Sequence, residues 1–209
     1  MVAYPAGNRL DPQIANNEIV SRALTEGALK IAFLGSVISR KNLHTLLDAL
    51  TLVKEDWRLT IIGNLDVEPA YVERIRQQIM RLGLGEKVTF TGALNDESLK
   101  IALRNHHLLA LPSSYEGFGI AYLEGMGYGL PAIGSTDGAA HEIITTYVDG
   151  YLVNPSDAET LASYLRPLAR DREKLIQMSL AARERYLSHP TWDESMAQIR
   201  KFLLKAARA

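Results

Sequence analysis

Two glutamates and several glycines lie close together in the segment Ser113–Ser135, which reads SSYEGFGIAYLEGMGYGLPAIGS. Seven residues separate Glu116 from Glu124, and the surrounding segment is otherwise mainly apolar. A carboxylate that is buried in an apolar segment is costly unless hydrogen bonds or an opposite charge compensate it. The spacing therefore indicates a binding site in which a ligand supplies some of those partners.

The glycines of this segment suggest how such a ligand would be held. Gly117 and Gly119 allow backbone N–H groups to approach a ligand closely, and we expect a helix from about Gly119 to Tyr128. Glu116 then lies in the loop before the helix, and Glu124 lies about one turn inside it with its side chain directed towards the N-terminus. Two carboxylates for hydroxyl groups and free N–H groups for oxygens suit a sugar nucleotide. Taken alone, Glu116 would be an exposed loop acid and Glu124 an acid stabilised by the helix dipole.

A basic pair lies in an earlier segment, GSVISRK. Arg40 and Lys41 fall where we expect the helix carrying Leu43–Leu50 to begin, and the helix dipole disfavours cations there by about 0.3 to 1 kcal/mol each. An anion bound at this helix N-terminus would turn the two cations into a phosphate site. The alternative is a solvated basic pair on a loop.

Short apolar runs that alternate with amphipathic segments predict the elements that position these residues. The helical segments carry apolar residues three and four positions apart. Strands that are apolar on both faces and alternate with helices indicate an α/β fold, a Rossmann-like parallel six-stranded sheet with helices on both faces and a helical C-terminal segment. The expected strands are Lys30–Leu34, Arg58–Ile62, Lys87–Thr91, Leu108–Leu111, Pro131–Gly134 and Tyr151–Val153.

The chain divides into three expected parts. Residues 1–28 contain an irregular start with Pro and Gly and a short amphipathic stretch at 17–26, which is typical of a linker or hinge entering a domain. Residues 29–190 form the Rossmann-like nucleotide-sugar-binding domain, and residues 191–209 form a C-terminal helix. Helix starts are expected at Asn95-Asp96-Glu97 and at two capping boxes, Ser156-x-x-Glu159 and Thr191-x-x-Glu194.

Ligands of open parallel sheets bind beyond the carboxyl ends of the strands, near the point where the strand order reverses. The loops that follow the first five expected strands are therefore the candidate site. They are Gly35–Lys41, Gly63–Glu68, Gly92–Asp96, Pro112–Gly119 and Ser135–Glu142.

Composition narrows the class of protein. A net charge of −1 over 209 residues lacks the overall basic field of a nucleic-acid binder, so no nucleic-acid partner is expected. The chain has no cysteine, and its apolar runs are interrupted well before the roughly 18 residues of a membrane span. We expect a cytoplasmic protein, with any peripheral membrane contact of the intact protein made mainly by another part.

The two-glutamate segment resembles the E-x7-E signature of the retaining glycosyltransferases of family GT4, which have the GT-B fold. The resemblance extends over about Val2–Leu187 and is to the C-terminal, donor-binding half only. It is carried by KIAFLGSVISRKNLHTLLDAL, KVTFTGAL, GLPAIGSTDGAAHEII and DGYLVNPSDAETLASYL.

The resemblance implies roles for individual residues. Glu116, with the Phe118 and Gly119 amides, would contact the transferred sugar, and Glu124 would bind the ribose hydroxyls. Arg40 and Lys41 would hold the diphosphate, so that Glu116, Arg40 and Lys41 are the expected catalytic residues. The other expected donor-binding positions are Gly35, Ser36, Gly63, Ala93 or Leu94 at the base, Ser113, Gly117 and Ile120.

The sequence departs from the family pattern in three places. The family usually has arginine where this chain has Ser36, so that one diphosphate contact is either absent or supplied by Arg40. It usually has glycine where this chain has Asn42. The third departure is the segment from Gly138 to Glu142, where a Gly-Gly pair and a proline are common.

The resemblance implies transfer of a hexosyl unit from a nucleotide sugar to an acceptor hydroxyl with retention, the acceptor being a saccharide or a lipid-linked saccharide. The acceptor half, an N-terminal GT-B domain, is not in the sequence. No metal or cofactor is expected, because basic residues and helix N-termini would neutralise the diphosphate. A nicotinamide-binding domain is disfavoured because GSVISRKN lacks G-x-G-x-x-G. Two alternatives remain, a donor-binding module without turnover of its own and a GT-B-like sugar-nucleotide epimerase.

Overall fold

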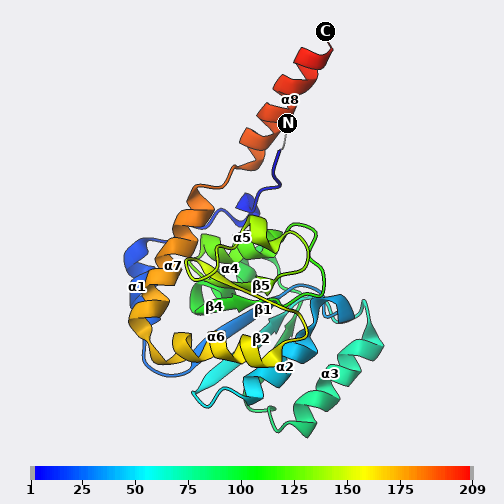
Figure 1. Cartoon of the computed structure of the whole chain (residues 1–209), viewed down its shortest axis with the longest axis vertical. Coiled ribbons are helices and arrows are strands. Elements are labelled where there is room, and N and C mark those ends of the chain that lie inside the picture. Colours follow the sequence, from blue (N-terminus) through cyan, green and yellow to red (C-terminus); the bar gives the residue numbers. More distant parts are fainter. Residues whose placement is uncertain (1–2, 208–209) are drawn as a thin grey trace.

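The sheet of this domain has six parallel strands in the order β3-β2-β1-β4-β5-β6. The computed structural model describes residues 3–207, and Figure 1 shows the whole chain. The strands are β1 (Leu29–Leu34), β2 (Trp57–Ile62), β3 (Val88–Gly92), β4 (Leu108–Ala110), β5 (Ala132–Ser135) and β6 (Gly150–Val153). All six expected strands are confirmed, each with its ends within one residue of the expected ones.

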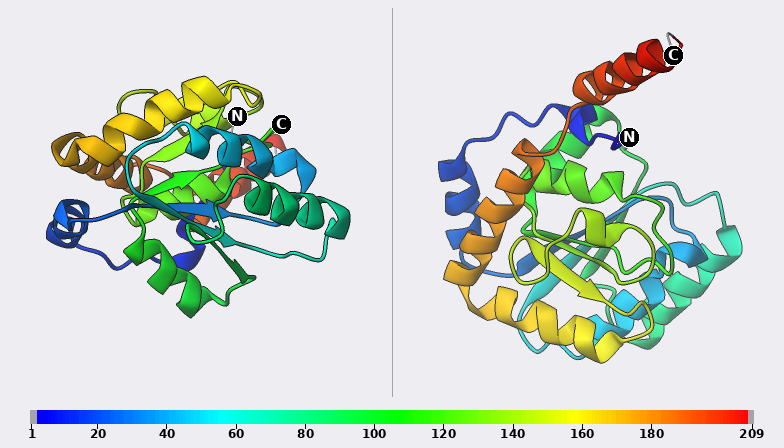
Figure 2. Two further views of the ribbon diagram at one scale, coloured as in Figure 1. Left: turned by 90° about the horizontal axis from the view of Figure 1, so that it is seen from below. Right: turned by 45° about the horizontal axis from the view of Figure 1, so that its top comes forward.

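Helices cover both faces of the sheet. Figure 2 shows α2 and α6 on one face and α4 on the other, and α7 runs beside α1 and α5. β1, β4 and β5 are almost wholly buried between these layers, whereas β3 is an edge strand whose residues are only partly covered. The helices are α1 (Asn16–Leu24), α2 (Leu43–Thr51), α3 (Pro69–Arg81), α4 (Asp96–Asn105), α5 (Ile120–Gly127), α6 (Ala158–Arg170), α7 (Arg172–Leu187) and α8 (Trp192–Ala206).

The helix starts test the capping predictions. Asn95 caps α4 by accepting a hydrogen bond from the Ser98 N–H, and Thr191 forms the expected capping box with Glu194 on α8. The box expected at Ser156 is wrong. Asp157 caps α6 instead, since its carboxylate accepts from the Thr160 N–H at 2.8 Å.

Ser156 lies in the turn before α6. Its N–H and its hydroxyl both donate to Oδ1 of Asn154, at 3.0 and 2.8 Å. The Asn154 side chain therefore orders the turn, and the N-cap residue is Asp157, one position after the Ser156 of the expected capping box.

The chain before β1 packs on the domain. Leu10 and Ala23 are buried in the main hydrophobic core, and Ile19 of α1 is fully buried. Gly7 lies so close to α5 that a Cβ atom there would be 2.3 Å from the Cβ of Leu123. Residues 6–24 thus share their packing with the sheet, and the linker role of residues 1–28 stays a prediction.

The last helix, α8, extends away from the rest of the molecule (Figure 1). Ser195 is its one buried residue among those described, and Ser195 Oγ donates to the Tyr4 carbonyl at 2.7 Å. Phe202, Leu203 and Leu204 near its end are about half exposed. None of the described helices is long and apolar enough to cross a bilayer.

Candidate functional site

The strand order reverses between β1 and β4, which are hydrogen-bonded neighbours at the centre of the sheet. β1 leads through α2 to β2 on one side, and β4 leads through α5 to β5 on the other. The loops that follow β1 and β4 therefore diverge at this point, the place where open α/β sheets bind their ligands. These two loops hold Arg40, Lys41 and Glu116.

Lys41 and Glu116 form an ion pair across the two loops. Nζ of Lys41 lies 2.6 Å from Oε2 of Glu116, and each side chain is 13% exposed. The Ser113 hydroxyl also donates to Oε2 of Glu116, at 3.4 Å. The fold thus brings together one cation and one anion of the expected site.

Arg40 also joins these two loops, through hydrogen bonds to the main chain of the loop after β4. Its Nη1 donates to the Tyr115 carbonyl at 2.7 Å, and its own carbonyl accepts from the Ser114 N–H at 2.8 Å. The Arg40 side chain is therefore engaged with the loop that carries Glu116, and its expected role at a diphosphate stays a prediction.

The basic pair does not begin α2. Arg40 and Lys41 lie in a separate 3-10 turn, Ser39–Lys41, and Asn42 follows in the left-handed conformation with φ 57° before α2 begins at Leu43. Glycine, which is usual here in the family pattern that the sequence resembles, adopts this left-handed conformation without steric cost. The Asn42 side chain donates to the carbonyls of Pro112 and Pro155, so it holds the loop after β4 beside α2.

A third loop contacts Glu116 from the far side. The Glu116 carbonyl accepts from the Ala139 N–H at 2.8 Å, and a Cβ on Gly138 would lie 2.2 Å from that carbonyl oxygen. Gly138 also has φ 88°. His141, three residues further on, is exposed and contacts the Gly138 carbonyl through Nδ1. The segment from Gly138 to Glu142 departs from the family pattern, but it retains a glycine at position 138, where the close contact with the Glu116 backbone requires one.

The glycines beside Glu116 differ in their surroundings. Gly119 has φ 101°, and a Cβ there would lie 2.4 Å from the Tyr122 ring, so the start of α5 requires glycine. Gly117 faces open space, since a Cβ added there would meet no atom within 4 Å. Gly117 is therefore dispensable for packing and leaves room beside Glu116.

Glu124 is paired with a residue that the sequence did not single out. Nε of Arg9 lies 2.9 Å from Oε1 of Glu124, whose side chain is only 8% exposed. Another nitrogen of Arg9, Nη1, pairs with Asp96 at the start of α4. Burial raises the pKa of Glu124 above its ordinary value, and the Arg9 guanidinium opposes that rise. No local pattern around Arg9 indicates this contact.

The remaining expected positions lie along the same edge of the sheet. Gly63, after β2, approaches the loop after β1, since a Cβ there would lie 1.9 Å from the Gly35 carbonyl oxygen. Glycine is thus required at position 63 because the loop after β2 contacts the loop after β1 there. Ser36 is half-buried in the loop after β1. Ala93 and Leu94, in the loop after β3, are exposed and half-buried, and Ile120, the first residue of α5, is exposed.

Phe118 contacts both ends of the domain. Its ring lies 6.4 Å from that of Tyr4 and 5.9 Å from that of His189, measured between centroids. Tyr4 belongs to the segment before α1, and His189 to the turn between α7 and α8. The loop between the two glutamates is therefore covered by residues from both segments.

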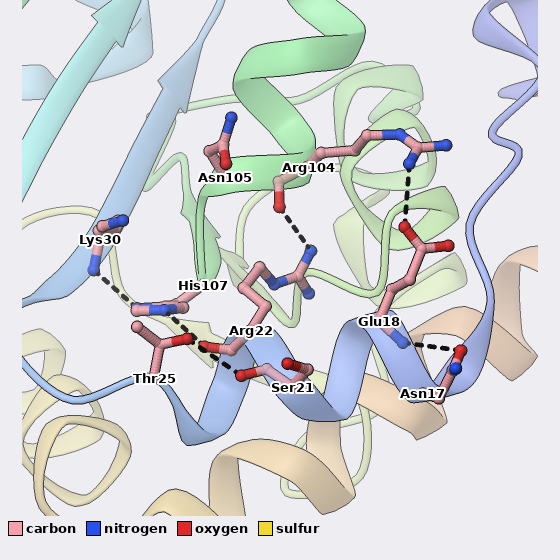
Figure 3. Close-up of a pocket in the computed structure, with 9 residues that line it drawn as sticks. All are labelled: Asn17, Glu18, Ser21, Arg22, Thr25, Lys30, Arg104, Asn105 and His107. Atoms are coloured by element: carbon pink, nitrogen blue, oxygen red, sulfur yellow. Dashed lines mark hydrogen bonds and ion pairs between the residues drawn. The ribbon is translucent and has the colours of Figure 1, made fainter.

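A pocket of about 580 Å³ lies at the opposite edge of the sheet. It is lined by α1, the start of β1 and the end of α4 with the residues just after it, and Figure 3 shows Arg104 reaching to Glu18 and His107 lying between Lys30 and Arg22. The Arg22 guanidinium donates to the Tyr128 and Gly129 carbonyls, and Arg104 pairs with Glu18. The hydrogen bonds of Arg22 and the ion pair of Arg104 with Glu18 join α1 to the rest of the domain. The polar groups that line this pocket therefore have a structural role.

The histidines have structural surroundings. His106 contacts Thr60 Oγ1, and His107 accepts from the Lys30 N–H at 3.0 Å while its Nε2–H donates to the Arg22 carbonyl. Burial lowers the pKa of His107 to about 4. Between residues 3 and 207, no three His, Asp or Glu side chains group closely enough to hold a metal ion.

The fold is an α/β domain of the Rossmann-like type, with the candidate residues along one edge of its sheet. Residues 16–185 match the family model of the glycosyl transferases group 1, and the chain belongs to that family. It is one half of a GT-B fold, the fold of its structural neighbours.

Curated relatives agree with this assignment. The chain is 34% identical over 134 residues to an uncharacterized glycosyltransferase of Methanocaldococcus jannaschii, covering 63% of this chain and 33% of the relative. It is 28% identical over 187 residues to a GDP-mannose-dependent alpha-(1-6)-phosphatidylinositol monomannoside mannosyltransferase of Mycobacterium tuberculosis, covering 83% of this chain and 46% of the relative. The chain thus spans half or less of the length of these relatives.

Solved structures show the same fold. HepE of Anabaena in complex with UDP-glucose superposes with a TM-score of 0.84 at 25% identity, over 98% of this chain and 57% of HepE. The C-terminal domain of a group 1 glycosyl transferase, LpcC of Francisella tularensis, matches with a TM-score of 0.74 at 21% identity, over 88% of this chain and 97% of that domain. The second structure has nearly the same extent as this chain and corresponds to it in fold.

Proposed function

We propose that this chain binds the nucleotide-sugar donor of a retaining hexosyltransferase. The observation that carries the proposal is the Lys41–Glu116 ion pair at the point where the strand order reverses, with Glu124 on the helix that follows the same loop. Cations, carboxylates and a glycine with free space beside it are the groups that a diphosphate, a sugar and a ribose require. The structure of HepE with UDP-glucose, which has this fold, supports the ligand class.

The diphosphate would lie against the loop after β1. Lys41 supplies a cation that is largely shielded from solvent, where a charged hydrogen bond is stronger than at the surface. When a diphosphate binds, Lys41 can hold Glu116 and a phosphate oxygen together, since an ammonium group has three donors. Arg40 would contribute charge while it keeps the two loops joined.

In the transfer step, the bond between the anomeric carbon and the β-phosphate oxygen breaks, and the nucleoside diphosphate leaves with the electron pair. The acceptor hydroxyl oxygen bonds to the anomeric carbon on the same face, and its proton passes to the departing phosphate oxygen. Lys41 and Arg40 stabilise the negative charge that develops on the diphosphate. Glu116 orients the sugar hydroxyls, with an acceptor saccharide or lipid-linked saccharide bound by a second domain.

Calorimetric titration of the chain with UDP, GDP and ADP, and then with their sugars, tests the binding step without added metal. We expect saturable binding of one nucleotide, and its loss in Glu124→Ala. Glu86→Ala is the matched control, because Glu86 is exposed just before β3 at the opposite edge of the sheet. Absence of binding by the wild-type chain to all three nucleotides and their sugars would contradict the proposal.

Turnover requires a separate test. Because the chain covers about half of its relatives, binding without transfer by this chain alone is the second candidate function. A longer protein that carries this chain together with an acceptor domain should transfer the sugar, and NMR of the product should show a retained anomeric configuration. An inverted product would contradict the proposed mechanism, and hydrolysis or epimerisation alone would place the chain in another enzyme class.

A further inference from the structure

Arg9 reaches the carboxylate of Glu124 from a distant part of the chain. It lies in the 3-10 turn Asn8–Leu10, where Leu10 is buried and Gly7 contacts Leu123 of α5. These contacts place the turn directly beside the helix that carries Glu124. The Arg9 guanidinium then donates to Oε1 of Glu124 through Nε.

The two members of this pair differ in exposure. The Arg9 side chain is 50% exposed, whereas that of Glu124 is 8% exposed. Asp96, which is 53% exposed, pairs with Nη1 of the same guanidinium. Arg9 therefore lies between two carboxylates, an exposed one on Asp96 and a buried one on Glu124.

Glu124 depends on Arg9 for its charge. Burial favours the neutral form of the carboxyl group, and the charged groups of the described chain that face it are Arg9 on the 3-10 turn and Asp96 on α4. Asp96 is an anion and favours the neutral form as well. Arg9 is thus the group that favours the ionised carboxylate.

The two carboxylate oxygens of Glu124 have different surroundings. Because Arg9 binds Oε1 through Nε, Oε2 remains for a ligand, and the guanidinium, which Asp96 also holds through Nη1, restrains the position of Oε1. A ribose offers two neighbouring hydroxyl groups, and only an ionised carboxylate acts purely as an acceptor for them. Correct orientation of Glu124 therefore matters for recognising ribose.

We infer that Arg9 is a positioning residue for the ribose of the donor, acting through Glu124. The inference rests on the proposed function, which assigns a nucleotide to this site. Arg9 holds the Glu124 carboxylate ionised and correctly turned while ribose hydroxyls bind, and it stays in place when the nucleotide enters.

The test uses the nucleoside diphosphate that binds the wild-type chain, together with its 2′-deoxy and 3′-deoxy forms, titrated between pH 5 and 8. We expect Arg9→Gln to weaken binding of the ribonucleotide by about tenfold or more at pH 5.5 and by less at pH 8. The preference for ribose over deoxyribose should shrink in the same variant. Arg9→Lys keeps the charge and should recover most of the affinity at low pH but less of the ribose preference.

Arg58→Ala is the matched control. Arg58 is also 50% exposed and pairs with an aspartate, Asp56, but it lies at the amino end of β2. Its removal should leave both the pH profile and the ribose preference unchanged. A uniform loss of affinity at every pH in Arg9→Gln, with the ribose preference kept, would overturn the inference, and so would tighter binding, which would show that Arg9 competes with the ligand.

A second measurement separates this inference from the proposed function. The carboxyl group of Glu124 can be titrated by NMR in the ligand-free protein, with Glu124→Gln for assignment. Its pKa should rise in Arg9→Gln and stay near the wild-type value in Arg58→Ala. If the wild-type chain binds no nucleotide, the proposed function fails, and an unchanged Glu124 titration in Arg9→Gln overturns the inference independently.

Discussion

Nζ of Lys41 and Oε2 of Glu116 lie 2.6 Å apart, although 75 positions separate the two residues in the sequence. The pair joins the loop after β1 to the loop after β4 where the strand order reverses. Each side chain is mostly shielded from water, so each is a required partner of the other.

Replacing Lys41 with alanine should weaken binding of the nucleoside diphosphate by about 1.5 to 3 kcal/mol, the range for a hydrogen bond to a charged group. It should also lower thermal stability, because Glu116 loses its partner. Calorimetry and thermal unfolding measure the two effects. Lys54→Ala is the control, since Lys54 is exposed in the loop before β2. Unchanged nucleotide affinity in Lys41→Ala would remove Lys41 from the binding site.

Gly117→Ala should weaken ligand binding without changing the stability of the fold. A Cβ at this position meets no protein atom within 4 Å, so the free energy of unfolding should change by less than about 0.5 kcal/mol. Binding of the nucleotide sugar should weaken about tenfold or more, and binding of the free diphosphate by less, because Gly117 lies beside Glu116. Full retention of sugar-nucleotide affinity would show that the sugar lies elsewhere.

Gly119→Ala is the contrasting variant. Gly119 has φ 101°, and a Cβ there meets the Tyr122 ring at 2.4 Å. We expect a loss of at least about 1 kcal/mol in the free energy of unfolding, measured by denaturant titration. A variant as stable as the wild type would mean that α5 can begin without left-handed glycine.

Asn42→Gly should show how much the Asn42 side chain contributes to the stability of the fold, at a position where the family usually has glycine. Glycine relieves the left-handed conformation but removes hydrogen bonds to Pro112, Pro155 and Thr45. Because these groups are buried, we expect a net loss of about 1 to 2 kcal/mol in the free energy of unfolding, measured by denaturant titration. Asn42→Ala should be less stable still, since alanine also has a Cβ in left-handed geometry. Greater stability of Asn42→Gly would contradict this account.

His107 should make the fold sensitive to mild acid. Its folded pKa of about 4 lies below the ordinary value of 6.5, so the unfolded chain binds the proton more tightly than the folded one. Stability from this group is present above about pH 6.5 and is lost as the pH falls towards 4, by up to about 3 kcal/mol. Protonation would also place a proton on Nδ1, which accepts from the Lys30 N–H.

Denaturant titrations at several pH values between 7 and 4 measure this loss. In His107→Asn the free energy of unfolding should fall less steeply over the same range, although the variant is less stable at pH 7. His141→Asn is the control because His141 is exposed. An equal slope in wild-type and His107→Asn proteins would assign the acid sensitivity to other groups.

The sheet could be predicted closely because buried parallel strands are continuous apolar runs. Ile31–Leu34 and Leu59–Ile62 illustrate this, since nearly every residue in them is buried. The placement of Glu116 and the basic pair at one edge of the sheet followed from their positions just after two expected parallel strands, whereas the strand order that makes their loops neighbours came from the structure. Local sequence also predicted the start of α5, because Gly119 is the last residue before the helix.

Contacts between loops could not be predicted in this way. Arg9 and Glu124 are 115 positions apart, and their pairing depends on how Gly7 and Leu10 pack against α5. Arg40 was expected inside the first turn of α2, but the left-handed Asn42 separates it from that helix. Such contacts depend on three-dimensional packing, which leaves no periodic pattern in the sequence.

The segment from Tyr4 to Arg9 contacts both halves of the two-glutamate motif, through Phe118 and through Glu124. If a nucleotide binds at Glu124 as proposed, docking of this segment and binding of the nucleotide should therefore be linked equilibria. If docking tightens nucleotide binding by some factor, the nucleotide must tighten docking by the same factor. Protection of the backbone amides of residues 6–10 against hydrogen exchange should therefore rise when a nucleotide binds, in a part of the chain more than a hundred positions before Glu124.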